Sequence, residues 1–193
     1  MKKIPTLFER IYDEKGNIIG ISDKVKEGFE WVLNGEGIAT LKVDGSCCAV
    51  INGEFYKRYD AKKGKKPPEG AIPCQEAPDP ITTHWPHWVK LSRDNPADKW
   101  FIRAFHDMPW PDGTYEAIGP HFQGNPYGLD EDTIYRHGTK FLPDFPRDFE
   151  GMKKYFELNV IEGVVFWKDC EPKCKIKRSD FGFEWNKGVK YGK

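Results

Sequence analysis

The sequence predicts an α+β fold of antiparallel strands, arranged as one domain over residues 1–193. Short runs of strand-forming residues recur along the chain, and turns that contain glycine separate them. Only two segments show the spacing of apolar residues that an amphipathic helix requires. Aromatic residues make up 15% of the chain, which argues against disorder and supplies a core.

The N-terminal part of the chain begins with a predicted hairpin. Residues 6–12 and 18–21 are its strands, and Lys15-Gly16-Asn17 is its turn. Ser22 is then expected to cap a helix that Asn34-Gly35 ends. The apolar stripe of that helix comprises Val25, Phe29, Val32 and Leu33.

A second hairpin is predicted around Asn52-Gly53, because this dipeptide is the strongest short signal for a tight turn between strands. Its strands are residues 38–51 and 54–59. Residues 67–100 hold seven of the fifteen prolines and are expected to be mostly irregular. The remaining predicted elements are strands at 101–105, 114–118, 160–167 and 174–178, and a helix at 149–156.

The charge balance limits the classes of function. Thirty Lys and Arg residues offset thirty Asp and Glu residues, which excludes a uniformly basic nucleic-acid binder but permits a basic face. No run approaches the roughly 20 apolar residues of a membrane-spanning helix. Because residues 1–5 also lack an apolar signal segment, we expect a cytoplasmic protein with no membrane partner.

The five cysteines fit no disulfide framework, so reduced thiols are expected. Cys170 and Cys174 have the spacing of a zinc-binding pair, which His84 and His87 would have to complete. Nothing in the sequence links the two pairs. Buried thiols beside a pair of loop histidines are therefore the favoured interpretation.

Lys42 and Asp44 share one face of a predicted strand, and the alternate residues of 39–43 form an apolar face that is expected to meet the core. A lysine at the end of a mostly buried strand loses solvation, which favours its neutral and nucleophilic form. The alternative interpretation is an ordinary lysine at the end of a strand, followed by a turn at Gly45. The four residues alone do not decide between these interpretations.

Two segments are strongly basic. Residues 57–66 carry six basic residues and one aspartate, and residues 173–193 carry seven basic residues and two acids. In the second segment, Lys173, Lys175 and Lys177 alternate with apolar residues, which predicts that their charges lie on one face. Adjacent like charges are costly unless an anion neutralises them, so the pattern indicates bound phosphate. A solvated charged loop explains either segment taken alone.

Glu116 and Glu162 each lie within an apolar, strand-forming run. An ionised carboxylate in such a run needs a partner, which is a metal ion, a ribose hydroxyl or a cation. For each glutamate alone, a structural salt bridge is the simplest interpretation.

Taken in order, these segments resemble the motifs of the covalent nucleotidyltransferases, the superfamily of polynucleotide ligases and mRNA capping enzymes. Lys42-Val43-Asp44-Gly45 resembles motif I, and Arg58 resembles the arginine of motif Ia. Residues 114–120 resemble motif III, 162–166 motif IV and 175–177 motif V. Five motifs in the right order are far more specific than any one of them.

Within that superfamily, the resemblance is strongest to small ATP-dependent 5′–3′ RNA ligases of eukaryotic and viral type. It rests on residues 42–48 and on Gly124-Asn125-Pro126-Tyr127-Gly128. It implies a single adenylation domain in which helices flank antiparallel sheets. Because only 16 residues follow Lys177, we expect no C-terminal OB domain.

The resemblance implies an enzyme that joins RNA ends bearing a 5′-phosphate and a 3′-hydroxyl, in RNA repair or processing. ATP is the implied cofactor, together with Mg²⁺ or Mn²⁺ held by Glu162. AMP is carried covalently on Lys42, RNA is the implied partner, and no protein partner is expected. The implied nucleotide-binding residues are Thr40, Lys42, Arg58, Glu116, Glu162, Lys175 and Lys177.

Each of these residues has an implied role. Lys175 and Lys177 neutralise charge at the α-phosphate. Glu116 accepts hydrogen bonds from the ribose, and Arg58 binds a ribose or phosphate oxygen. Thr40 lies where the family contacts adenine. The aromatic residue that stacks on adenine has no clear counterpart, and Tyr135 is the nearest candidate.

Three alternatives share these residues. A GTP-using mRNA guanylyltransferase and a DNA ligase have the same motifs, but the expected absence of an OB domain disfavours both. A non-catalytic RNA-binding module is disfavoured because every charged motif residue is present.

One feature of the second hairpin conflicts with the assignment of Arg58. Pairing Ile51 with Glu54 puts Arg58 opposite Cys47, on the face away from Lys42 if the strand alternates without interruption. A bulge, or a change of phase near Gly45, is required.

Overall fold

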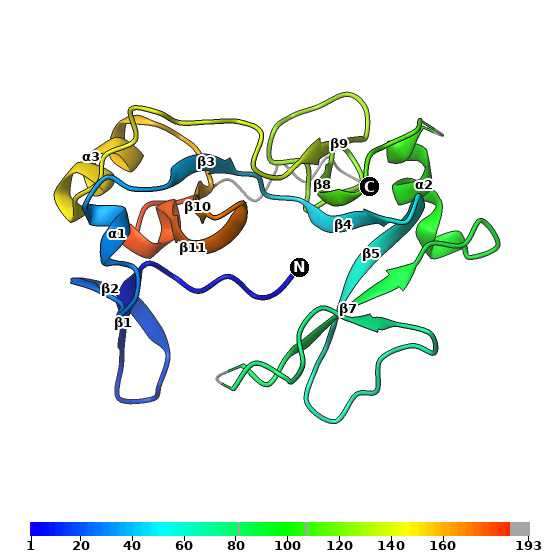
Figure 1. The fold of residues 1–193 in the computed structure, drawn as a ribbon, viewed down its shortest axis with the longest axis horizontal. Coiled ribbons are helices and arrows are strands. Elements are labelled where there is room, and N and C mark those ends of the chain that lie inside the picture. The colour runs from blue at the N-terminus through cyan, green and yellow to red at the C-terminus, as the bar shows by residue number, and fades with distance from the viewer. Residues whose placement is uncertain (81, 107, 186–193) are drawn as a thin grey trace. The chain divides into compact units, whose positions relative to one another are not determined.

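The computed structural model describes residues 1–80, 82–106 and 108–185, in which antiparallel strands predominate and three short α-helices occur (Figure 1). The predicted α+β class with antiparallel strands is therefore confirmed. The longest of these helices has ten residues, and no helix of the described ranges has the length and apolar character needed to cross a bilayer.

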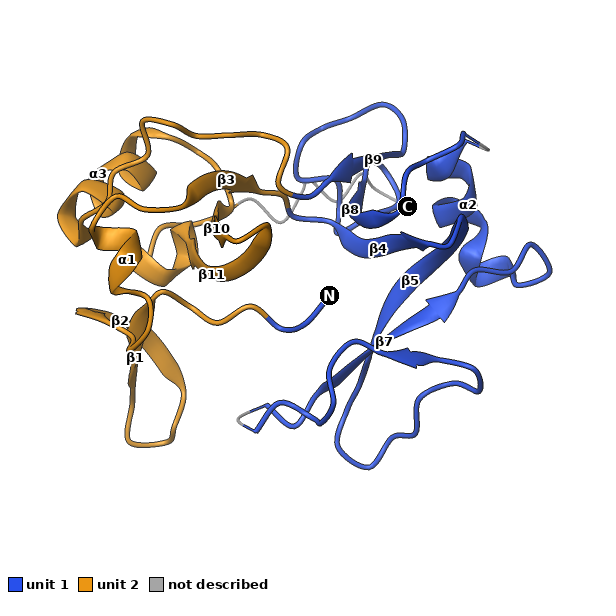
Figure 2. Cartoon of the chain, in the orientation of Figure 1, with its two compact units in different colours: residues 1–3, 44–137, 186–193 blue, residues 4–43, 138–185 orange. Residues whose placement is uncertain are grey.

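The chain forms two compact units (Figure 2). Among the described residues, unit 1 comprises 1–3 and 44–137, and unit 2 comprises 4–43 and 138–185. Each unit has its own cluster of buried apolar side chains. Because the chain enters unit 1 at residue 44 and leaves it at 137, the two units are interleaved in sequence. That they form the one expected domain stays a prediction.

Unit 2 contains a three-stranded antiparallel sheet in the order β11-β10-β3. The strands are β3 (Ile38–Lys42), β10 (Gly163–Lys168) and β11 (Glu171–Lys177). Met152 and Phe156 of helix α3 (Phe149–Leu158) are fully buried in the same cluster as the inward residues of the sheet. Those inward residues are Ala39, Val164, Phe166, Cys174 and Ile176. The predicted C-terminal strand pair and the predicted helix before it are confirmed.

The N-terminal hairpin of unit 2 is also confirmed, as β1 (Phe8–Tyr12) and β2 (Ile18–Val25). The helix predicted after Ser22 is wrong over most of its length. Strand β2 continues to Val25, which pairs with Phe8, so Ser22 lies inside a strand and caps no helix. Only α1 (Glu30–Leu33) is helical, and it ends at Asn34 as expected.

Unit 1 contains a six-stranded sheet in the order β6-β7-β5-β4-β8-β9. Helix α2 (Lys99–Phe105) contributes Ala104 and Phe105 to the apolar cluster that also holds Cys48, Val50 and Tyr115 of the sheet. The strands are β4 (Ser46–Ile51), β5 (Glu54–Ala61), β6 (Ile72–Pro73), β7 (Trp85–Lys90), β8 (Gly113–Ile118) and β9 (Thr133–Arg136).

The predicted strand over 38–51 is divided into two strands that belong to different sheets. β3 ends at Lys42 and β4 begins at Ser46, so side-chain alternation is not continuous between them. The turn at Asn52-Gly53 is confirmed, because both residues have positive φ angles of 52° and 74° and Ile51 pairs with Glu54. The uninterrupted alternation that would put Arg58 on the face away from Lys42 is therefore absent, because the strand breaks at 43–45.

The segment 101–105 is helical, so the strand predicted there is wrong. Asn95 accepts a hydrogen bond from the Ala97 N–H and Pro96 follows it, which starts a helical turn, η1 (Pro96–Asp98), directly before α2. Residues 100, 101, 104 and 105 then form one face at helical spacing that packs on the core of unit 1, where 104 and 105 are fully buried. The proline-rich segment before it also contains β6 and β7, which were not predicted.

Candidate functional site

Lysines gather on the face of the unit 2 sheet that points away from its core. Gly163 of β10 lies in register between Lys42 of β3 and Lys177 of β11. A Cβ at Gly163 would lie 2.6 Å from the Ile176 carbonyl oxygen, so only glycine fits between these strands. Lys175 precedes Lys177 by two residues and shares its face. The sheet therefore presents three lysine side chains around a position that has no side chain.

Glu162, directly before β10, is the partner of Lys42. Its Oε2 atom lies 2.6 Å from the Lys42 Nζ, and the two side chains are only 9% and 22% exposed. The prediction that a carboxylate in this apolar run needs a partner is confirmed, and the partner is a cation. The separation is short enough for direct proton transfer between the two groups.

The charged form of Lys175 is disfavoured by its surroundings. Burial lowers the pKa of Lys175 from 10.5 to about 8, and the nearby charges of Lys42 and Lys177 lower this pKa too. The carboxylates of Glu162 and Asp180 have the opposite effect on it. Three lysines and only two carboxylates thus act on one another here, and a bound anion would neutralise the excess positive charge.

The N-terminal segment of unit 2 holds Lys175 from the outer edge of the sheet. The Lys175 N–H donates to the Pro5 carbonyl at 2.9 Å, and its carbonyl accepts from the Leu7 N–H at 2.8 Å. Both backbone groups of Lys175 are therefore bonded to residues 5–7, while β11 pairs with β10 along its other edge, so the side chain emerges from a well-held position.

The prediction that Lys173 joins this face is wrong. The register shifts between Phe166 and Trp167, so that Cys174 pairs with Phe166 while Pro172 pairs with Trp167, and Lys173 has no place in the ladder. Its Nζ lies 2.6 Å from Glu171 instead. Two of the three alternating lysines, not three, belong to the cluster with Lys42.

Thr40 is buried and already engaged within the sheet. Its hydroxyl accepts a hydrogen bond from the Trp167 indole N–H at 2.8 Å and lies 3.4 Å from the Val165 carbonyl oxygen. Trp167 was not predicted as a site residue, although its alternation with Gly163 and Val165 puts it on the face of Lys42. Its ring also packs closely over Gly138, where a Cβ would lie 3.0 Å away.

In unit 1, Glu116 is held by two contacts. Its Oε1 accepts the Gly45 N–H at 3.1 Å, and its Oε2 lies 2.9 Å from Nε2 of His137. The other ring nitrogen of His137 lies 3.0 Å from the Thr114 hydroxyl. His137 was not predicted, because its approach to Glu116 depends on the pairing of β8 with β9.

Arg58 lies on β5, where its Nε donates to Asp60 at 2.9 Å. Cys48 of β4 pairs with Lys57 of β5, so the next position on each strand places Arg58 opposite Cys47, as predicted. On the other side of β4, Cys47 pairs with Glu116 of β8. Arg58, Cys47 and Glu116 therefore follow one another across three neighbouring strands. Tyr135 continues this row, because it pairs with Glu116 on β9.

The predicted residues divide between the units. Arg58 and Glu116 belong to unit 1. Unit 2 brings together the remaining predicted residues, Thr40, Lys42, Glu162, Lys175 and Lys177.

The boundary between the units falls inside Lys42-Val43-Asp44-Gly45, after Val43. The Asp44 N–H donates to the Tyr127 hydroxyl at 2.7 Å, which ties this turn to the segment Gly124–Gly128. A Cβ on Gly45 would lie 2.3 Å from the Ala117 carbonyl oxygen. The glycine is therefore required because the turn passes directly over β8.

The basic segments contribute less free charge than their composition indicates. Lys57 forms an ion pair with the buried Asp98, and Arg58 forms one with Asp60. Residues 62–66 are exposed. The last part of the C-terminal segment, 186–193, lies outside the described residues.

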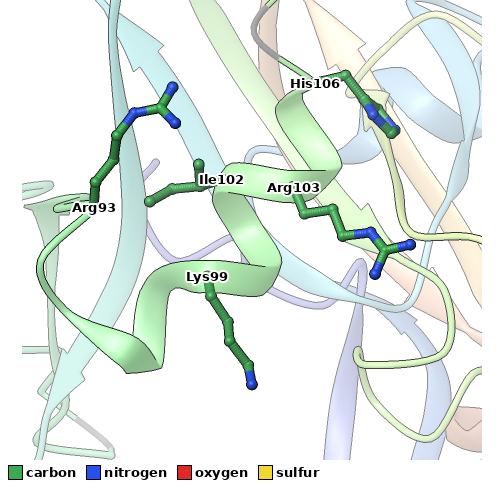
Figure 3. A pocket seen from close by; sticks show the side chains of 5 residues that line it. All are labelled: Arg93, Lys99, Ile102, Arg103 and His106. Atoms are coloured by element: carbon green, nitrogen blue, oxygen red, sulfur yellow. The ribbon is translucent and has the colours of Figure 1, made fainter.

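A basic hollow of about 500 Å³ lies on helix α2 of unit 1 (Figure 3). Exposed cationic or titratable side chains make up most of its lining. The sequence does not predict this hollow, because it depends on a helix where irregular chain and a strand are expected. Lys99 also lies over the Trp100 ring, with its Nζ 4.4 Å from the ring centroid. The lining residues are Arg93, Lys99, Ile102, Arg103 and His106.

The zinc pairing of Cys170 and Cys174 with His84 and His87 finds no support. Cys174 is fully buried in the core of unit 2, where desolvation raises the pKa of its thiol to about 12. His84 and His87 belong to unit 1. The interpretation of Cys174 as a buried structural thiol is confirmed.

Sequence comparison identifies no relative. No protein-family model matches the chain, and no curated protein matches it significantly.

Proposed function

We propose that the chain is an ATP-dependent RNA ligase that carries AMP on Lys42. The observation that supports this most is the cluster in unit 2, where Lys42 is paired with Glu162 beside Lys175 and Lys177. A reactive amine next to fixed, partly desolvated positive charge suits attack on a phosphorus atom that bears anionic oxygens. The resemblance of the five motifs supports the same activity.

In the first step, the Lys42 amine attacks the α-phosphorus of ATP. A nitrogen–phosphorus bond forms, the bond from that phosphorus to the bridging oxygen breaks, and pyrophosphate leaves with the electron pair. The amine must lose its proton first, and Glu162 lies within reach to accept it. Lys175 and Lys177 neutralise the charge that develops on the phosphate oxygens.

The donor set of unit 2 also suits a divalent cation. Mg²⁺ prefers oxygen ligands and is commonly held by one or two carboxylates together with substrate phosphates. Glu162 is the carboxylate beside Lys42 that would hold it, and the ion would offset charge on the triphosphate.

Two residues of unit 1, Glu116 and Arg58, have roles in this proposal. Glu116 fixes the Gly45 N–H, so it positions the second half of the motif that contains Lys42. In the proposed enzyme, Glu116 and Arg58 also bind oxygens of the ribose or phosphate. An aromatic residue that stacks on the base is also part of this proposal, and its candidates are Trp167 in unit 2 and Tyr135 in unit 1.

In the later steps, AMP passes from Lys42 to the 5′-phosphate of an RNA end, and a 3′-hydroxyl then attacks that phosphate and releases AMP. The RNA partner is supported by the basic hollow on α2, which Arg93, Lys99 and Arg103 line. Clustered basic side chains are typical of surfaces that contact the phosphates of nucleic acids.

Labelled ATP tests the proposal. Label in the α-phosphate should stay with the denatured protein, and label in the γ-phosphate should not. GTP should label the protein far less than ATP. Lys42→Met should abolish labelling, whereas Lys168→Met, which alters an exposed lysine of the same sheet, should not. Equal labelling of both variants would refute the proposal.

A further inference from the structure

Three different ligand-type side chains converge in unit 1. The Cys47 sulfur, a Glu116 carboxylate oxygen and a His137 ring nitrogen all lie within 4.8 Å of one another. They come from β4, from β8 and from the residue after β9, three neighbouring positions in one sheet. Within the described ranges, no other group of three such side chains comes together in this way.

The histidine is already oriented as a metal ligand requires. Its Nε2 points to Glu116 at 2.9 Å, and its Nδ1 lies 3.0 Å from the Thr114 hydroxyl. Metal-bound histidines usually make such a second hydrogen bond, which fixes the ring and its tautomer. Thr114 and Glu116 lie two residues apart on β8 and share one face, so this strand supplies both hydrogen-bond partners of the His137 ring.

We propose that Cys47, Glu116 and His137 form a binding site for Zn²⁺, with a fourth position left for water or another ligand. Sulfur, imidazole and carboxylate ligands together suit Zn²⁺, which binds all three in tetrahedral geometry. Mg²⁺ and Ca²⁺ prefer oxygen ligands alone, so the sulfur and nitrogen donors select against them.

The charges around the site are compatible with this ion. Burial raises the pKa of the Cys47 thiol to about 12, and the Glu116 carboxylate raises it as well. Zn²⁺ removes such a proton on binding, because a coordinated thiol is deprotonated outright. The resulting thiolate and the carboxylate then balance the two positive charges of the ion. The nearby Arg58 therefore faces a neutral group, and its own charge is paired with Asp60.

The three ligands all belong to unit 1, and the site shares Glu116 with the proposed function. If that function holds, a Zn²⁺ ion on Glu116 competes with the nucleotide. Zn²⁺ should then inhibit labelling by ATP, and a chelator should restore it. The decisive measurement is nevertheless metal binding to the protein alone, without ATP or RNA.

Cobalt(II) is the probe for that measurement, because its absorption reports sulfur ligation. The reduced wild-type chain should bind one equivalent of Co²⁺, with a thiolate charge-transfer band that stoichiometric Zn²⁺ abolishes. Cys47→Ser should lose the band, whereas Cys170→Ser, at an exposed cysteine of unit 2, should keep it. Thr114→Val should weaken Zn²⁺ binding by about 10- to 100-fold in competition with a chromogenic chelator.

Two results would overturn the proposal. One is the absence of stoichiometric binding at micromolar metal, and the other is an unchanged band in Cys47→Ser. Circular dichroism of each variant shows that it is folded, and His137→Gln is the second variant should Cys47→Ser fail to fold. Because no nucleotide is present, these results do not depend on whether the chain is a ligase.

Discussion

Lys175 should lower the free energy of unfolding of the protein, although its charge favours the binding of an anion. Its ammonium group is buried beside two other lysines, so the folded state must hold a charge that the unfolded chain solvates freely. Lys175→Met keeps most of the apolar stem and removes the charge. We therefore expect the variant to be more stable than the wild type and to bind pyrophosphate or ATP more weakly.

The size of the effect follows from the pKa of Lys175. The difference between 10.5 and about 8 is about 2.5 pH units, and at 1.36 kcal/mol for each unit this corresponds to about 3 kcal/mol. Below pH 8, the lysine is charged in both states and the full cost is present. Between pH 8 and 10.5, the unfolded chain binds more protons than the folded one, so wild-type stability rises with pH. The advantage of Lys175→Met should shrink over this range and vanish near its upper end.

Urea unfolding at pH 7 and pH 10.5 tests this expectation. Lys173→Met is the matched control, because Lys173 lies on the same strand but outside the cluster and should leave the unfolding midpoint unchanged. Loss of stability in Lys175→Met at pH 7, or a gain that does not change with pH, would refute the reasoning. Isothermal titration with pyrophosphate measures the accompanying loss of anion binding.

Three further predictions concern the other parts of the site. Glu162→Gln removes the partner of Lys42 and should reduce labelling by ATP about 10²-fold, whereas wild-type labelling would assign Glu162 a structural role. Lys99→Glu combined with Arg103→Glu should weaken RNA binding and flatten its salt dependence while ATP labelling stays unchanged; unaltered RNA affinity would exclude the hollow as a contact. Gly45→Ala should lower the free energy of unfolding by about 1–3 kcal/mol, because its Cβ would meet the backbone of β8, and an unchanged melting temperature would contradict that clash.

Local patterns predicted those parts of the site that depend on a single strand or on strands close in sequence. The alternation of Lys175 and Lys177 with apolar residues identified their face correctly, and the tight turn at Asn52-Gly53 set the register of Arg58 against Cys47. The need of Glu162 for a partner followed from its apolar surroundings. In each case the physical constraint acts over a few residues.

Features that depend on distant pairing were missed. His137 reaches Glu116 only because β9 pairs with β8, and the bulge that displaces Lys173 arises from the pairing of β11 with β10. The sequence predicts a strand at 101–105 because aromatic and β-branched residues suit strands, whereas the helical turn that begins after Asn95 leads this segment into helix α2. Where the residues suit both a helix and a strand, capping and tertiary packing determine which of the two forms.

The most direct test of the central claim is the intact mass of the protein after incubation with ATP and Mg²⁺, followed by peptide mapping. The account predicts a gain of one AMP, located on Lys42, that pyrophosphate reverses and that Lys42→Met abolishes. No gain in mass under these conditions, or an adduct that maps to another residue and persists in Lys42→Met, would contradict it.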